Sequence, residues 1–125
     1  MKGFPHRVFV YGTLKRGQRN DHYLHAAEFI GHFTTTSVYS MYVFDDYPAV
    51  CLQGRHAISG EVYHVSDEQF GLLDELEWYP DFYQRIEIPT DFGVAWMYIV
   101  RDKLCRGKRQ ITGIWPYVEN DSGSC

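Results

Sequence analysis

The sequence predicts an α+β fold, built on a small mixed or antiparallel sheet that curls toward a barrel, with two main helices. Segments rich in Val, Ile, Thr and Tyr recur along the 125 residues, and such segments are typical of strands. Only two segments carry both a start and a stop signal for a helix. Many strands with few helices indicate the α+β class rather than alternating α/β units.

Strands are expected in six places. Arg7–Tyr11 is β-branched and aromatic, and Val94–Val100 is almost continuously apolar, as in a strand that is covered on both faces. The turn signal Thr90–Gly93 joins this last strand to the one before it in a hairpin. The other predicted strands are Thr34–Phe44, Ala49–Leu52, Ala57–Val65 and Tyr83–Pro89.

Two helices are expected. The first begins at Asn20 or Asp21, which are good N-cap residues, and stops at Gly31. The second covers residues 66–80, where the initial serine and Gln69 match a capping box and acidic residues fill the first turn. A proline closes this second segment, because proline cannot continue a helix.

The composition predicts one domain over residues 1–118 and a flexible polar tail at residues 119–125. The net charge of −4 disfavours nucleic acid as a partner, since phosphates require a basic face. No apolar run reaches the roughly 20 residues that cross a bilayer, so no membrane association is expected. Three cysteines without a CxxC spacing favour a reducing, cytoplasmic location over a disulfide framework.

The first predicted strand ends in a small, polar and basic loop. Gly12 and Gly17 are spaced as in a phosphate-binding P-loop, but Gln18 and Arg19 follow where that motif requires Lys and then Ser or Thr. A nucleoside-triphosphate site is therefore rejected. Two interpretations remain open: a plain turn that needs glycine for its shape, or a turn whose N–H groups at residues 12–14 bind a carboxylate or an oxyanion.

Glu77 falls on the apolar side of the second predicted helix. At about 100° per residue it lies between Phe70 and Leu73, whereas Glu75 points to the opposite side. Burial raises the pKa of a carboxyl group, and a carboxyl that titrates near neutral pH suits general acid/base catalysis. The alternative is that the helix frays here, so that Glu77 turns to solvent or pairs with Arg85.

Metal binding and thiol catalysis have weaker support. His22 and His25 lie three residues apart, but no third ligand stands at a metal-binding spacing. Cys51 has no base nearby in the sequence that would activate it as a nucleophile. We therefore expect neither a metal nor a cofactor.

Three blocks follow one another along the chain: VFVYGTLKRGQ at Val8–Gln18, GEVYHV at Gly60–Val65 and LDELEWYPDFYQR at Leu73–Arg85. In these blocks the chain resembles the gamma-glutamylcyclotransferase-like family, most closely the gamma-glutamylamine cyclotransferases and their small bacterial relatives. The resemblance extends over about Val8–Val100. It implies a small barrel-like α+β fold with the first loop at the floor of a cavity.

The resemblance also implies roles for individual residues. In the family, the first loop binds the substrate through backbone groups, a glutamate is the catalytic acid/base, and a tyrosine lines the site. These roles fall here on the loop residues Tyr11, Gly12, Thr13 and Leu14, on Glu77 and on Tyr83, respectively.

The implied substrate is a small gamma-glutamyl compound whose α-amine attacks its own γ-carbonyl. The products are 5-oxoproline and a free amine or amino acid, and the reaction needs no metal or cofactor because the substrate supplies the nucleophile. A non-catalytic small-molecule binder on the same scaffold is one alternative. Another is an interaction module in which Trp78, Tyr79 and Trp115 form an exposed partner surface.

Overall fold

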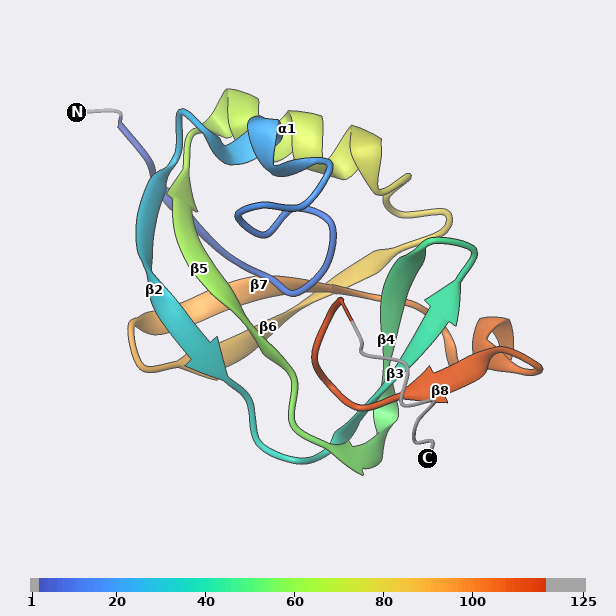
Figure 1. The fold of residues 1–125 in the computed structure, drawn as a ribbon. Coiled ribbons are helices and arrows are strands. Elements are labelled where there is room, and N and C mark those ends of the chain that lie inside the picture. Colours follow the sequence, from blue (N-terminus) through green and yellow to red (C-terminus); the bar gives the residue numbers. More distant parts are fainter. Residues whose placement is uncertain (1–2, 117–125) are drawn as a thin grey trace.

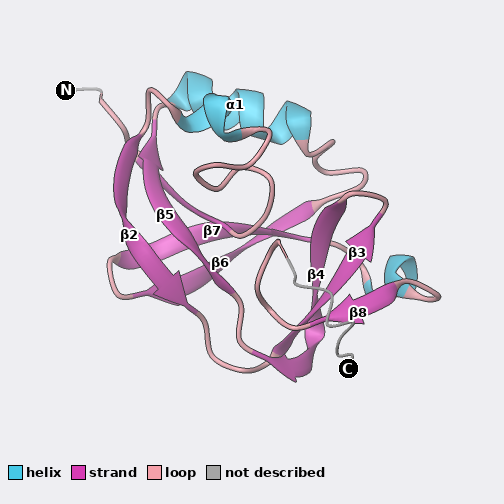
Figure 2. Cartoon of the chain, viewed as in Figure 1, coloured by secondary structure: helices cyan, strands magenta, loops and turns pink. Residues whose placement is uncertain are grey.

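One main helix and two β-sheets make up the computed structural model, which describes residues 3–116 (Figure 1, Figure 2). The helix is α1 (Asp67–Leu76), and η1 (Asp21–Leu24) and η2 (Asp102–Cys105) are short 3-10 turns. The strands are β1 (His6–Val10), β2 (Glu28–Thr34), β3 (Tyr39–Phe44), β4 (Tyr47–His56), β5 (Ser59–Val65), β6 (Gln84–Thr90), β7 (Gly93–Ile99) and β8 (Arg109–Ile111). The tail predicted at residues 119–125 lies outside the described residues.

The five-stranded sheet has the order β2-β5-β1-β7-β6, and the three-stranded sheet has the order β4-β3-β8. The β1–β7 pair is parallel and the other pairs are antiparallel, so the larger sheet is mixed. The Val100 N–H donates to the Val50 carbonyl (2.9 Å), which ties the end of β7 to β4 in the other sheet. The sheets are not closed, so the predicted barrel-like shape is corrected to two open sheets.

The central strand β1 is buried on both faces. Val8 and Val10 pack in one hydrophobic cluster, with Leu73 of α1, whereas Phe9 packs in a second cluster on the other side, with Met97 of β7. Successive side chains of a strand point to opposite faces, so a run of apolar residues contributes to two cores at once. This burial holds the end of β1, and the loop that follows it, in a defined place.

The helix predicted from Asn20 to Gly31 is wrong. Only η1 is helical there, and the chain continues as β2, which pairs with β5. Gly31 adjoins a register shift within the strand instead of ending a helix, and its α-carbon faces the ring of Phe92. Over these few positions the apolar residues fit both the 3.6-residue period of a helix and the two-residue period of a strand. Pairing with the edge of β5 selects the strand.

The other predicted elements are present with changed limits. The single strand expected over Thr34–Phe44 is interrupted at residues 35–38, so that β2 and β3 belong to different sheets. The strand expected at Ala49–Leu52 extends to ten residues in β4, and β8 was not predicted. The second helix begins as predicted, with Ser66 and Gln69 forming a capping box in both directions.

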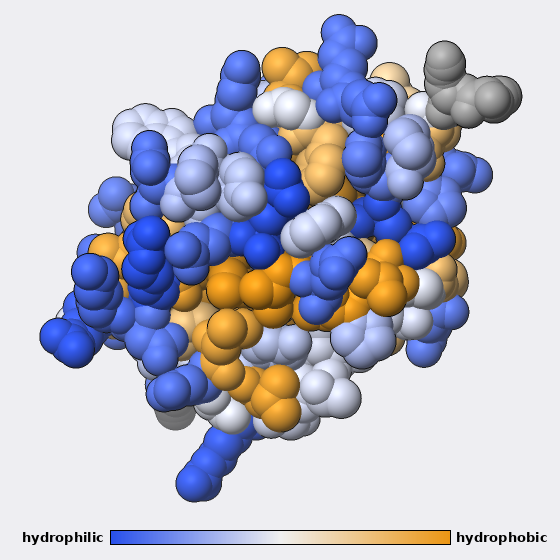
Figure 3. Space-filling view, turned by 180° about the vertical axis from the view of Figure 1, so that it is seen from behind, coloured by the Kyte–Doolittle hydropathy of each residue, from blue (hydrophilic) through white to orange (hydrophobic). Residues whose placement is uncertain are grey.

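Within residues 3–116, no helix has the length and apolar character that crossing a bilayer requires. The back of the molecule carries a band of apolar residues between hydrophilic margins (Figure 3). Figure 1 shows α1 lying across one end of the larger sheet, beside η1. On the other face of this sheet, Phe9 and Met97 pack with Met41 of β3 and Val50 of β4, so the second sheet covers that face.

Candidate active site

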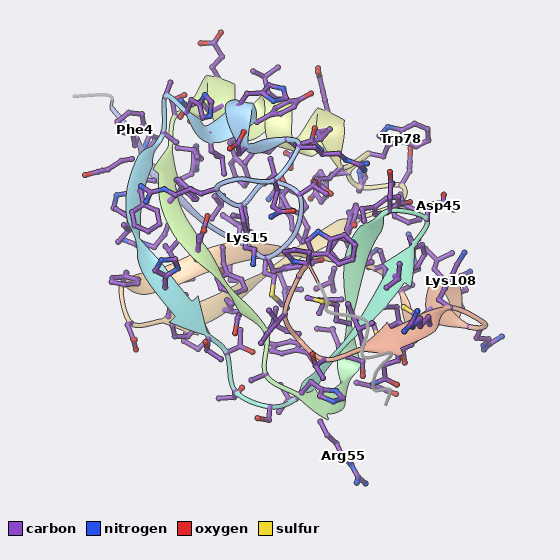
Figure 4. The ribbon with its side chains drawn as sticks, viewed as in Figure 1. Phe4, Lys15, Asp45, Arg55, Trp78 and Lys108 are labelled. Atoms are coloured by element: carbon purple, nitrogen blue, oxygen red, sulfur yellow. The ribbon has the colours of Figure 1, made fainter. Side chains whose placement is uncertain are left out.

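A cavity of about 340 Å³ opens between the loop after β1, the start of β4, the end of α1 and the turn that follows α1. All six residues predicted for the site line it: Tyr11, Gly12, Thr13, Leu14, Glu77 and Tyr83. Sequence reasoning missed ten other lining residues: Phe9, Val10, Arg19, Asn20, Tyr47, Pro48, Leu76, Trp78, Phe82 and Tyr98. In Figure 4 the cavity is bordered by the loop that carries Lys15, the β3–β4 turn that carries Asp45 and the turn that carries Trp78.

The loop after β1 approaches the start of β4 very closely at Gly12. A Cβ atom at this position would lie 2.7 Å from Cγ of Pro48, so only glycine permits the contact. Among the described residues, no loop hydrogen bond takes its donor from the N–H groups of Gly12, Thr13 or Leu14. Three neighbouring backbone N–H groups, on residues that line the cavity, thus have no hydrogen-bond partner among residues 3–116, and successive N–H groups of this kind can bind an anion.

Two polar residues, Glu61 and Asn20, hold this loop in shape. The buried carboxylate of Glu61 accepts hydrogen bonds from the Arg16 N–H (2.9 Å) and from the Tyr63 hydroxyl (3.0 Å). Asn20 binds the loop from its other side, because its side chain donates to the Thr13 hydroxyl (3.0 Å) and its N–H donates to the Thr13 carbonyl (2.9 Å). Asn20 resembled a helix N-cap in the sequence, but its side chain caps nothing in η1.

Glu77 occupies the C-cap position of α1 and lines the cavity. Its N–H donates to the carbonyl of Leu73 (3.0 Å), one turn earlier on the fully buried side of the helix. The residue is half-buried and lines the cavity, so the side chain does not turn fully to solvent. Burial raises the pKa of the Glu77 carboxyl from 4.5 to about 7, so that near neutral pH this group can both accept and return a proton.

Arg85 pairs with Asp74 and not with Glu77. Its guanidinium donates to both oxygens of the Asp74 carboxylate (3.0 and 3.1 Å), and Oδ1 also accepts the hydroxyl of Tyr98 (2.6 Å). The guanidinium lies against the rings of Phe70, Tyr79 and Trp96, with centroids 4.2–4.7 Å away. This network attaches the last turn of α1 to β6 and β7, and among residues 3–116 no ion pair to Glu77 is formed.

Both predicted tyrosines are buried, and their hydroxyl protons are used in the fold. Tyr11 donates to the carbonyl of Tyr98 (2.8 Å), and Tyr83 donates to the carbonyl of Pro48 (2.7 Å). Burial, together with the nearby Glu77, raises the pKa of both hydroxyls well above the ordinary value, so both stay neutral. They shape the wall around Glu77, and Tyr83 fixes the proline that Gly12 contacts.

The weaker sequence candidates lie elsewhere. Cys51 is buried, and burial raises the pKa of its thiol, which keeps it un-ionised and a poor nucleophile. Within residues 3–116, no three His, Cys, Asp or Glu side chains are grouped as metal ligands would be. Trp78 and Tyr79 are exposed, but Trp115 is 8% exposed and belongs to a hydrophobic cluster, so the expected exposed surface is wrong for Trp115.

Comparison with known proteins identifies one protein family. The family described as "Gamma-glutamyl cyclotransferase, AIG2-like" matches residues 8–117. A member from Vibrio cholerae is 41% identical over 97 residues, which cover 78% of this chain and 84% of the relative. The gamma-glutamylcyclotransferase family protein YtfP of Escherichia coli K12 is 33% identical over 109 residues, which cover 87% and 95% of the two chains.

Solved structures agree with the sequence comparison. Protein PH0828 of Pyrococcus horikoshii superposes with a TM-score of 0.75 at 34% identity, covering 88% of this chain and 89% of its own. A mouse AIG2-like protein superposes with a TM-score of 0.69 at 27% identity, covering 76% of each chain. The chain belongs to the AIG2-like gamma-glutamylcyclotransferase family.

Proposed function

We propose that this protein is a cyclotransferase that converts a gamma-glutamyl amine or amide into 5-oxoproline and a free amine or amino acid. The observation that carries the proposal is the Glu77 carboxyl, whose pKa burial raises to about 7, in the same cavity as the free N–H groups of the loop after β1. Membership of the gamma-glutamylcyclotransferase family supports the same reaction type.

In the proposed reaction the neutral α-amine of the substrate attacks its γ-carbonyl carbon, and Glu77 accepts a proton from the α-nitrogen as the new bond forms. This closes a five-membered ring, and negative charge develops on the carbonyl oxygen. The bond from that carbon to the leaving nitrogen breaks as Glu77 returns its proton to this nitrogen. Bonds and protons balance without water, so the step depends on proximity within one molecule and on one acid/base group.

In addition to this proton transfer, the proposed reaction needs a group that binds negative charge, and the loop after β1 supplies it. In the proposal, the N–H groups of Gly12, Thr13 and Leu14 bind a negatively charged oxygen of the substrate, either its α-carboxylate or the developing oxyanion, and the fact that these residues line the cavity supports this. Tyr11 and Tyr83 keep the wall in place through their hydrogen bonds to backbone carbonyls. We place the reaction in the cytoplasm, where the buried free thiols of this chain would stay reduced.

The test is an assay for 5-oxoproline over a panel of gamma-glutamyl compounds: gamma-glutamylamines, gamma-glutamyl-lysine isopeptide, gamma-glutamyl dipeptides and glutathione. With the best substrate, Glu77→Gln should lower kcat by a factor of about 10²–10⁴, the range for losing a general acid/base. In the wild type kcat should rise as the pH increases through about 7, because the base must be ionised to accept the first proton.

Glu75→Gln is the matched control, because Glu75 is exposed on the same helix and does not line the cavity. Its activity should equal that of the wild type. Normal turnover by Glu77→Gln would refute the mechanism. If no compound in the panel yielded 5-oxoproline, and calorimetry still showed binding, the non-catalytic binder would be the better description.

A further inference from the structure

The turn after α1 places a tryptophan where helices usually end in glycine. The Tyr79 N–H donates to the Asp74 carbonyl (2.9 Å) and the Trp78 N–H donates to the Glu75 carbonyl (3.1 Å), which together form a Schellman motif. The residue at the centre of this motif takes a left-handed conformation, and Trp78 does so with φ 55°. This conformation is unfavourable for a bulky side chain and favourable for glycine.

The Trp78 side chain makes few contacts that could offset this strain. It is 72% exposed, and within residues 3–116 it shares no ring contact or side-chain hydrogen bond with another residue. Figure 4 shows the ring projecting beyond the end of α1, on the side of the β3–β4 turn. An exposed residue that also lines the cavity stands at its opening to solvent. In the part of the chain that the structure describes, no other large apolar residue with comparable exposure, such as Leu72 or Val94, lines the cavity.

The rest of this side of the cavity is aromatic as well. Tyr47 and Phe82 line it, with ring centroids 6.4 Å apart in an edge-to-face arrangement. Phe82 is tied to the same turn, because its N–H donates to the Trp78 carbonyl (2.9 Å). Aromatic rings packed in this way bind flat apolar groups well.

We infer that Trp78 is a specificity-determining residue, which contacts the leaving amine of the substrate and selects amines that carry a planar apolar group. The inference rests on the proposed function. Glu77 and the loop N–H groups engage the gamma-glutamyl unit inside the cavity, so the leaving amine extends toward the opening, where Trp78, Tyr47 and Phe82 lie. The strained turn is thus maintained for the ligand and not for the stability of the fold.

The kinetic test compares gamma-glutamylbenzylamide with gamma-glutamylmethylamide, two alkylamides that differ in the presence of a ring. The ratio of their kcat/KM values should favour the benzylamide in the wild type. Trp78→Gly should lower that ratio roughly threefold to tenfold, the range for one aromatic contact. Trp78→Phe should retain most of the preference, and Leu72→Ala, which changes an exposed residue of α1 outside the cavity, should retain all of it. An unchanged ratio in Trp78→Gly would overturn the inference.

Thermal unfolding separates this role from a structural one. Trp78→Gly relieves the left-handed strain, so its melting temperature should equal or exceed that of the wild type by a few degrees. A melting temperature clearly below that of the wild type would show that the ring stabilises the fold, and would also overturn the inference.

A binding measurement separates failure of the inference from failure of the proposed function. In Glu77→Gln, gamma-glutamylbenzylamide should protect tryptophan fluorescence from iodide quenching more than the methylamide does, because Trp78 is the most exposed of the three tryptophans. Equal protection by the two amides would count against the role of Trp78. Absence of 5-oxoproline from both amides and from the wider panel would instead count against the reaction itself.

Discussion

Replacing Glu77 by Gln should change how the stability of the protein depends on pH. Burial raises the pKa of this carboxyl from 4.5 to about 7. One pKa unit corresponds to about 1.4 kcal/mol, so ionising Glu77 in the folded state costs about 3 kcal/mol of stability. Below pH 4.5 the carboxyl is protonated in both states and this cost is absent. As the pH rises to about 7, the unfolded chain ionises while the folded protein keeps its proton, so the wild type loses stability.

The assay is urea denaturation of wild type and Glu77→Gln at intervals from about pH 4 to pH 8. The free energy of unfolding of the Gln variant, minus that of the wild type, should increase by about 3 kcal/mol over this range and then level off above the folded pKa. Glu75→Gln, an exposed change on the same helix, should show no such increase. Parallel curves for wild type and Glu77→Gln would refute the claim that the carboxyl is held out of water.

Four further substitutions test stability and can be checked by urea denaturation. Gly12→Ala forces a methyl group to within 2.7 Å of the Pro48 ring and should cost about 1–3 kcal/mol. Gly71→Ala, with open space around the added methyl group in α1, should instead stabilise by about 0.5–1 kcal/mol; equal effects of the two changes would contradict the predicted contact. Tyr83→Phe leaves a buried carbonyl without its donor and should cost about 1–2 kcal/mol, so a neutral result would mean that the hydrogen bond contributes nothing. Asp74→Asn breaks the ion pair between Asp74 (side chain 22% exposed) and Arg85 (16% exposed), and we expect it to lower the free energy of unfolding by about 2–3 kcal/mol. A loss below about 0.5 kcal/mol would mean that the pair contributes no more than an ion pair exposed to solvent.

The elements that the sequence predicted well are those with strong local signals. The capping box at Ser66 and the continuous apolar run that became β7 depend on neighbours in the sequence, and both are present. The helix prediction for the segment from Asn20 to Gly31 was wrong because the local signals there are ambiguous and the pairing partner, β5, lies about thirty residues further along the chain. The division of Thr34–Phe44 between two sheets also follows from long-range pairing.

In the candidate site, too, some features have a local signal in the sequence, and others depend on contacts between distant segments. The side of α1 that Glu77 occupies follows from helical periodicity, and the glycine-containing loop is visible as a break after the first strand. Pro48 and Asn20 carry no comparable signal, although one packs on Gly12 and the other anchors Thr13. Their roles depend on contacts between segments that are remote in the chain or that fold in an unpredicted way.

The amino-acid sequence by itself determined that a carboxylate ends the apolar side of α1 and that a glycine-containing loop ends β1, because both are consequences of local backbone geometry. Only the tertiary structure decided that these two features share one cavity, that Arg85 pairs with Asp74 rather than with Glu77, and that Trp78 stands at the opening. Burial and the choice of ionic partner depend on which surfaces meet when the sheets and the helix pack, and periodicity within one segment contains no information about that packing.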